Sequence, residues 1–190
     1  MNLFYEDYPA EIIVNGSEIP ILTDFRDYVR LLDMLKDTEI DPFEKYEIIC
    51  LYFKERPSDF EEAFDELIDF ITMEQFHEKH ASGDAQNSEE VPQKEVYSFS
   101  VDYPFIFSAF LRDYGINLRT IPYMHWWEFR LLFDGLSDDT EIKQRILYRS
   151  IDLNEVKDKD EKKRIEKIQR AIRLPSEELV TDYEIGDALW

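Results

Sequence analysis

The sequence predicts a mainly α-helical fold, a bundle-like set of helices preceded by one short β-hairpin. Glycine is scarce, with 5 residues in 190, and 34% of the residues are charged, a composition typical of helices rather than of glycine-rich barrels. Apolar residues recur at helical spacing along most of the chain. The apolar fraction of 44% suits one globular domain, or two small ones that share a core.

The hairpin is expected in the stretch EIIVNGSEIPIL. Asn15 and Gly16 separate two short β-prone runs, the strongest local signal for a two-residue type I′ turn. Pro20 has no amide hydrogen to donate, which restricts the second strand to an edge position.

Two helices follow, and a residue suited to the N-cap position precedes each of them. Thr23 or Asp24 precedes the first, and Asp41 precedes Pro42 at the first position of the second, which Pro57 ends. The apolar positions at helical spacing are Phe25, Tyr28, Val29, Leu32 and Leu35 in the first helix and Phe43, Tyr46, Ile49, Cys50 and Phe53 in the second. The chain's one cysteine is therefore expected to be a small buried hydrophobe, with no disulfide framework.

A third helix begins at Ser58, which stands in capping-box spacing with Glu61, and acidic residues line its outer face. Residues 1–76 thus form a first region of one hairpin and three helices. Residues 77–95 are polar and aperiodic, as in a flexible acidic linker.

The region 96–174 is predicted to be helical and to pack on the first region. The first helix of this region has one apolar face, formed by Phe107, Phe110, Leu111 and Tyr114, and Gly115 suits its end. A second helix has Thr120 near its cap, Pro122 in its first turn and Gly135 at its end.

The following helix starts near Ser137, whose neighbouring aspartates suit a helix N-terminus. The last helix buries a thin stripe of three isoleucines and ends at Pro175. These isoleucines are Ile165, Ile168 and Ile172. Residues 175–190 form an acidic tail, either disordered or ordered on a partner.

The stretch MHWWEFRLLFDG has broader apolar coverage than one helical stripe. Trp126, Phe129 and Phe133 share one face, with Trp127 and Leu131 beside it. Such a helix is either a core helix with surface ion pairs or a helix with a second side for a partner. We expect the two tryptophans to differ, one in the core and one at an assembly or client surface.

Charge is distributed unevenly. The net charge is −21, which disfavours binding to DNA or RNA. Residues 1–95 hold 8 basic and 25 acidic side chains, whereas residues 143–173 hold 11 basic and 6 acidic ones. Unlike patches favour head-to-tail association, although a solvated helix explains the basic region equally well. The candidate assembly residues are Lys162, Lys163, Arg164, Lys167 and Arg170.

No pattern typical of catalysis or cofactor binding occurs. His77, Glu78 and His80 are too few for a zinc site, because only His125 and Cys50 remain as further ligands of these types. Acid pairs such as Asp138 and Asp139 fall in predicted first helical turns, where carboxylates complement the helix dipole. We therefore expect a protein that is not an enzyme and has no metal or cofactor. Neither a signal peptide nor a membrane-spanning stretch is expected.

Three stretches, VNGSEIPILTDFR, YGINLRTIPYMHWWEFRLLFDGLSDDT and YRSIDL, together resemble the bacteriophage gene product fifteen family of long-tailed phages and prophages of Gram-positive bacteria. The resemblance covers most of residues 10–174, and its most specific part is HWWEFRLLFDGLSDDT. It implies a tail assembly chaperone that coats the long helical tape measure protein in the host bacterial cytoplasm and is absent from the mature virion. Other tail assembly proteins and further copies of the chain are implied partners.

The family motif adds weight to His125, Trp126, Trp127, Phe129, Arg130, Gly135, Leu136, Asp138, Asp139 and Thr140. The partner-binding residues expected from this motif and its neighbours are Tyr123, His125, Trp126, Trp127, Phe129, Arg130 and Phe133. The competing class is an acidic decoy that imitates DNA and inhibits a nucleic-acid-binding protein of the host, supported by the acidity of the first half.

Overall fold

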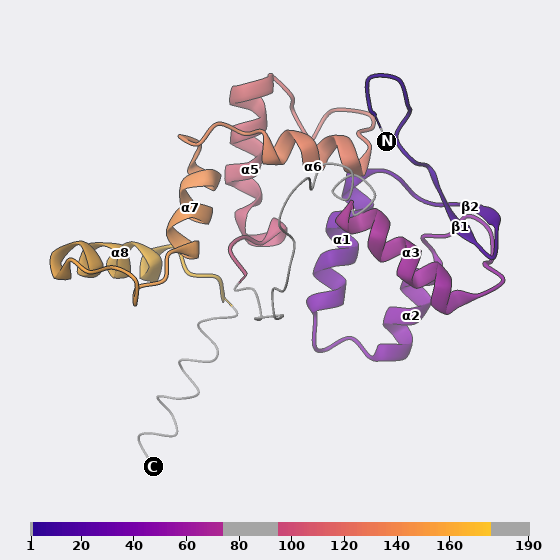
Figure 1. Cartoon of the computed structure of the whole chain (residues 1–190), viewed down its shortest axis with the longest axis horizontal. Coiled ribbons are helices and arrows are strands. Elements are labelled where there is room, and N and C mark those ends of the chain that lie inside the picture. The colour runs from indigo at the N-terminus through magenta and orange to yellow at the C-terminus, as the bar shows by residue number, and fades with distance from the viewer. Residues whose placement is uncertain (1, 74–94, 176–190) are drawn as a thin grey trace, which may run out of the picture. The chain divides into compact units, whose positions relative to one another are not determined.

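The computed structural model describes residues 2–73 and 95–175 (Figure 1). Within these residues the chain is mainly α-helical, with seven helices and one N-terminal β-hairpin, as predicted. It divides into two units: unit 1 comprises Met1–Val91 and Ile121–Asp134, and unit 2 comprises Pro92–Thr120 and Gly135–Trp190.

The hairpin opens unit 1. Strands β1 (Glu11–Val14) and β2 (Ser17–Pro20) pair antiparallel, with Val14 opposite Ser17. Asn15 and Gly16 connect them with φ angles of 50° and 74°, the backbone of a type I′ turn, which confirms the prediction. Alternate residues of the hairpin are buried, and β1 packs against the third helix, α3 (Phe60–Thr72).

The first helix, α1 (Phe25–Lys36), is capped by Asp24, whose carboxylate accepts a hydrogen bond of 2.9 Å from the Arg26 amide. The second helix, α2 (Pro42–Cys50), begins as predicted with Asp41 as its cap and proline at its first position. However, it ends at Cys50 and not near Pro57.

The chain leaves α2 early because its next residues pair with the strand end instead. The Leu22 amide donates to the Tyr52 carbonyl at 2.9 Å, and the Lys54 amide donates to the Pro20 carbonyl at 2.8 Å. Phe53 therefore continues an extended pairing with Ile21, where the sequence predicted another helical turn.

The cap of α3 is Asp59 and not Ser58, since the Asp59 carboxylate accepts hydrogen bonds from the Glu61 and Glu62 amides. A carboxylate at this position also complements the helix dipole. At the other end, Met73 adopts the left-handed conformation with a φ angle of 60°.

Segment 121–134 completes unit 1, although the sequence placed it in the region 96–174. Its helix α6 (Trp126–Asp134) starts four residues later than the predicted turn at Pro122. The preceding residues are extended because His125 forms a β-bridge with Asp24. The two rings of Trp126 and Trp127 are buried in the core of this unit.

Unit 2 contains three helices: α5 (Phe99–Tyr114), α7 (Glu141–Ser150) and α8 (Lys159–Ala171). Helix α7 packs against both others. Gly115 ends α5 with a φ angle of 67°, as predicted. The cap of α7 is Thr140 and not Ser137, because the Thr140 hydroxyl accepts from the Lys143 amide.

A buried ion pair holds unit 2 together. Arg149 binds both carboxylate oxygens of Asp102, at 2.6 and 3.0 Å, and also donates to the carbonyls of Val96 and Ile172. Both charged side chains are at most 3% exposed. The arginine thus ties the start of α5 and the end of α8 to α7.

In α8 only Ile165 of the three predicted isoleucines is fully buried, and Ile168 and Ile172 are half-buried. Among the residues that the structure describes, no helix has both the length and the hydrophobicity needed to cross a bilayer.

Candidate functional site

Residues 125–127, here called the HWW segment, are held in unit 1 by backbone hydrogen bonds on both sides of His125. The Phe25 amide donates to the Met124 carbonyl at 3.0 Å, and the Trp126 amide donates to the Thr23 carbonyl at 2.8 Å. The start of α6 is thereby fastened to the start of α1.

The two indoles cap the end of α3. Trp126 donates its ring N–H to the Ile71 carbonyl at 3.1 Å, and Trp127 donates to the Phe70 carbonyl at 2.9 Å. The last four carbonyls of a helix have no partner within it, so the two side chains supply donors to acceptors of this kind. Both tryptophans are at most 1% exposed, so the prediction that one of them lies at a surface is wrong.

Further aromatic rings extend this core. Phe129 stacks on Phe25 with ring centroids 4.6 Å apart, and also on Trp126 and Phe133. Tyr28 is fully buried against Trp126. The stretch MHWWEFRLLFDG, which the sequence left open between a core helix and a partner surface, therefore forms part of the core of unit 1.

His125 anchors residues 2–10, here called the N-terminal arm. Its Nε2 lies 2.9 Å from the Pro9 carbonyl, its Nδ1 accepts the Trp127 amide at 3.0 Å, and its ring stacks on Tyr8. These contacts require the neutral imidazole with its proton on Nε2. Burial lowers the pKa of His125 below its usual 6.5, which favours the same form.

Of the seven predicted partner-binding residues, five are buried, namely His125, Trp126, Trp127, Phe129 and Phe133. Tyr123 is 52% exposed, and its hydroxyl lies 2.8 Å from that of Thr23. Arg130 is half-buried, with its guanidinium 5.5 Å from the Trp126 ring centre. Most of this set thus lies inside the unit and offers little surface to a partner.

Sequence reasoning missed an exposed apolar surface on α5, here called the α5 face. Tyr103 is 65% exposed and Leu111 48%, and the half-buried Phe107 lies between them at a spacing of four residues. These three residues share one side of the helix.

The sequence instead placed Phe107 and Leu111 on one helical face together with Phe110 and Tyr114. The buried side of α5 carries Asp102, Ile106 and Ala109, because Asp102 turns inward to Arg149. Apolar residues occur all round this helix, which was the available signal for a second, uncovered face.

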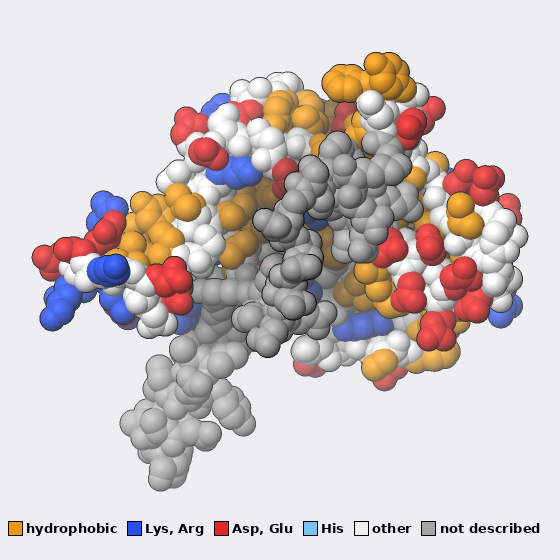
Figure 2. All heavy atoms as spheres, in the orientation of Figure 1, with side chains coloured by type: hydrophobic (Ala, Val, Ile, Leu, Met, Phe, Trp, Pro, Cys, Tyr) orange, Lys and Arg blue, Asp and Glu red, His pale blue; other side chains and the backbone are white. Residues whose placement is uncertain are grey.

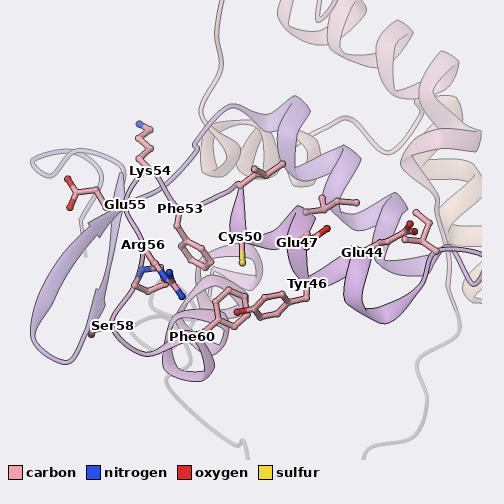
Figure 3. Close-up of a pocket in the computed structure, with 14 residues that line it drawn as sticks. Glu44, Tyr46, Glu47, Cys50, Phe53, Lys54, Glu55, Arg56, Ser58 and Phe60 are labelled. Atoms are coloured by element: carbon pink, nitrogen blue, oxygen red, sulfur yellow. The ribbon is translucent and has the colours of Figure 1, made fainter.

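Unit 1 has a separate apolar hollow beside α2, here called the α2 groove. Its volume is about 1160 Å³, and its floor includes Tyr46, Cys50, Phe53 and Phe60. Figure 3 shows the Tyr46 and Phe60 rings side by side, and their centroids are 4.2 Å apart. Of the five apolar positions that the sequence placed on one face of this segment, Ile49 and Phe53 are buried. Cys50, predicted to be buried, is half-exposed and lines the groove. Phe43 and Tyr46 are exposed as well.

The five predicted assembly residues, Lys162, Lys163, Arg164, Lys167 and Arg170, lie on α8 and are exposed except for the half-buried Lys162. Figure 2 shows basic and acidic side chains intermixed on this helix, and Arg170 forms a salt bridge with Glu166. On α3 the acids stand close together, and the pKa of Glu66 is raised by burial and by the neighbouring Asp69, Glu62 and Asp65.

The histidine pair considered for zinc, His77 and His80, lies outside the described residues together with Glu78. Within residues 2–73 and 95–175, no three His, Cys, Asp or Glu side chains cluster in a way that could hold a metal ion.

Comparison with known proteins gives one family. A family model described as Bacteriophage Gp15 protein matches residues 6–174, which is most of the chain. No curated protein and no solved structure gives a match.

Proposed function

The chain belongs to the bacteriophage Gp15 protein family, and on that premise we propose that it is a phage or prophage tail assembly chaperone without enzymatic activity. Its client is the long helical tape measure protein, which it keeps dispersed in the host bacterial cytoplasm until the tail tube assembles. The chaperone then leaves and is absent from the mature virion.

The observation that carries this proposal is the α5 face. Exposed apolar side chains four residues apart on a helix match the way in which an amphipathic helix presents its anchors. Tyr103, Phe107 and Leu111 would pack against the apolar side of a client helix. The net charge of −21 per chain would keep separate client-loaded complexes dispersed in solution.

The size of this face favours weak and reversible contacts. Complete burial of one large apolar side chain contributes about 1.5 to 3 kcal/mol, and these three are already partly covered. Together they would supply roughly 3 to 5 kcal/mol, equivalent to a Kd between about 0.2 and 6 mM. Many copies along one long client would raise the total affinity without making any single contact permanent.

Co-expression with a tape measure fragment tests the proposal. The wild-type chain should keep the fragment in the soluble fraction, whereas Leu111→Glu should release it to the pellet. Leu147→Glu is a matched control, because Leu147 of α7 is 52% exposed and Leu111 is 48% exposed. If Leu111→Glu is correctly folded and protects the fragment as well as the control does, the α5 face is not the client site.

The rival function is the acidic decoy, and the crowded carboxylates of α3 are the observation that favours it. Glu62, Asp65 and Asp69 surround Glu66, a density of negative charge that a basic nucleic-acid-binding protein could recognise. Binding of a basic nuclease that weakens steeply with salt would support this alternative. Binding of a tape measure fragment that varies little with salt would support the chaperone.

A further inference from the structure

The N-terminal arm ends in an exposed aromatic tip. Phe4 is 92% exposed and Tyr5 87% exposed. The tip is nevertheless a hydrogen-bonded turn, since the amides of Tyr5 and Glu6 both donate to the Asn2 carbonyl, at 2.9 and 3.0 Å. The Phe4 amide also donates to the Asn2 side chain. Two large apolar side chains are thus presented to solvent on a structured turn.

The base of the arm is fixed to unit 1. Tyr8 stacks on His125 with ring centroids 4.8 Å apart, and the Pro9 carbonyl lies 2.9 Å from His125 Nε2. Phe4 is four residues from Tyr8, so the tip reaches at most about 14 Å beyond this anchor. Figure 1 shows the arm and α2 at opposite ends of unit 1, so the tip does not occupy the groove of its own chain.

The α2 groove has the shape and chemistry to accept such a tip. Its volume of about 1160 Å³ is open to solvent, and Tyr46 and Phe60 form an aromatic wall. Phe53 meets Phe60 edge-to-face with centroids 5.9 Å apart. Added aromatic rings would continue this tilted and edge-to-face arrangement. Leu51, at the side of the groove, is 72% exposed and would be covered by an occupant.

Charge at the two ends of the groove fixes the direction of entry. Figure 3 shows Lys54, Glu55 and Arg56 on one side of the groove and Glu44 and Glu47 on the other. Neither Lys54 nor Arg56 forms a salt bridge with a described residue. The end with Lys54, Glu55 and Arg56 is thus net positive, and the end with Glu44 and Glu47 is negative.

The tip carries the complementary charge. Exposed Glu6 and Asp7 follow the two aromatic residues directly, and the first 25 residues contain no lysine or arginine. With Phe4 and Tyr5 in the groove, these acids would meet its basic end and avoid its acidic end.

We propose that the Phe4-Tyr5 tip of one copy docks in the α2 groove of a second copy. Tip and groove are different surfaces, so each bound pair still offers one free tip and one free groove. Such a head-to-tail contact repeats into a ring or an open filament. The contact involves unit 1 alone and does not depend on client binding by the α5 face.

Molar mass measured by light scattering across a concentration series tests the contact with the full chain. The wild type should grow beyond two copies as concentration rises. A tip variant, Phe4→Ser with Tyr5→Ser, and a groove variant, Leu51→Glu, should each remain monomeric. Leu147→Glu, another exposed leucine changed in the same way, should associate like the wild type.

Mixing the two variants is the decisive step, because the tip variant retains an intact groove and the groove variant an intact tip. An equimolar mixture should form particles of two copies, although neither variant associates alone. A monomeric wild type, association that survives either change, loss of association in Leu147→Glu, or a monomeric mixture would each overturn the proposal. Far-UV circular dichroism of each variant confirms that it is folded.

Discussion

Truncation of either tryptophan of the HWW segment should destabilise unit 1 strongly. Both indoles are at most 1% exposed, and each donates to a carbonyl in the last turn of α3. Loss of a fully buried aromatic side chain costs about 3 to 5 kcal/mol in unfolding free energy. We therefore expect about this loss for Trp126→Ala and for Trp127→Ala.

Phenylalanine substitutions separate packing from hydrogen bonding. Trp126→Phe and Trp127→Phe keep an aromatic ring but leave the Ile71 or Phe70 carbonyl without its indole donor. An unpaired buried acceptor costs about 1 to 3 kcal/mol, so each phenylalanine variant should fall between the wild type and the alanine variant.

Urea unfolding followed by far-UV circular dichroism measures these losses. In a thermal melt of a chain of this size, each kcal/mol lost lowers the Tm by about 2 to 4 °C, so the Tm of each alanine variant should be roughly 6 to 20 °C lower. At temperatures below the Tm of the variant, its client binding and self-association should match those of the wild type. An alanine variant with unchanged stability and no client binding would refute the reasoning, because the indole would then belong to a partner surface.

Other consequences concern individual contacts. Asp102→Ala should cost about 3 to 5 kcal/mol by leaving Arg149 buried without its carboxylate, whereas Asp102→Leu with Arg149→Met should recover most of that loss in the same urea assay. Because the folded-state pKa of His125 is lowered, its contribution to the unfolding free energy is fully present above pH 6.5 and is lost as the pH falls through the folded-state pKa. Over that interval the unfolding free energy of the wild type should fall by up to about 1.4 kcal/mol per pH unit more than that of His125→Gln. Parallel curves of unfolding free energy against pH for the two proteins would contradict this. Gly115→Ala should lower the unfolding free energy by about 1 to 2 kcal/mol, because a φ angle of 67° is strained for alanine. No atom beyond the adjacent residues lies within 4 Å of the new methyl group, so crowding adds nothing to this loss. An unchanged Tm would show that the helix end relaxes.

Local signals in the sequence predicted most of the elements. The Asn-Gly turn, the Asp41-Pro42 helix start and the glycine at the end of α5 each act through backbone conformations set by one or two residues. The early end of α2 could not be predicted in this way. It depends on hydrogen bonds from Leu22 and Lys54 to distant parts of the chain, and these outweigh the local preference.

The candidate surfaces were harder to predict, because an apolar residue at helical spacing looks the same whether it is covered or not. The sequence placed Leu111 on a helical face with Phe110 and expected one of the two tryptophans at a surface. The structure buries Phe110, exposes Leu111 and buries both tryptophans. In α5 the deciding residue is Asp102, since its ion pair with Arg149 turns the apolar Tyr103 outwards. That pairing spans 47 positions in the sequence and has no local signature.

Site-specific photo-crosslinking from α5 tests the proposed client site most directly. A photoreactive amino acid would replace Leu111 in one chain and the similarly exposed Leu147 in another, each co-expressed with the tape measure protein. The chaperone account predicts a strong crosslink to the tape measure protein from position 111 and little from position 147. No crosslink from position 111, or equal crosslinks from both positions, would contradict it.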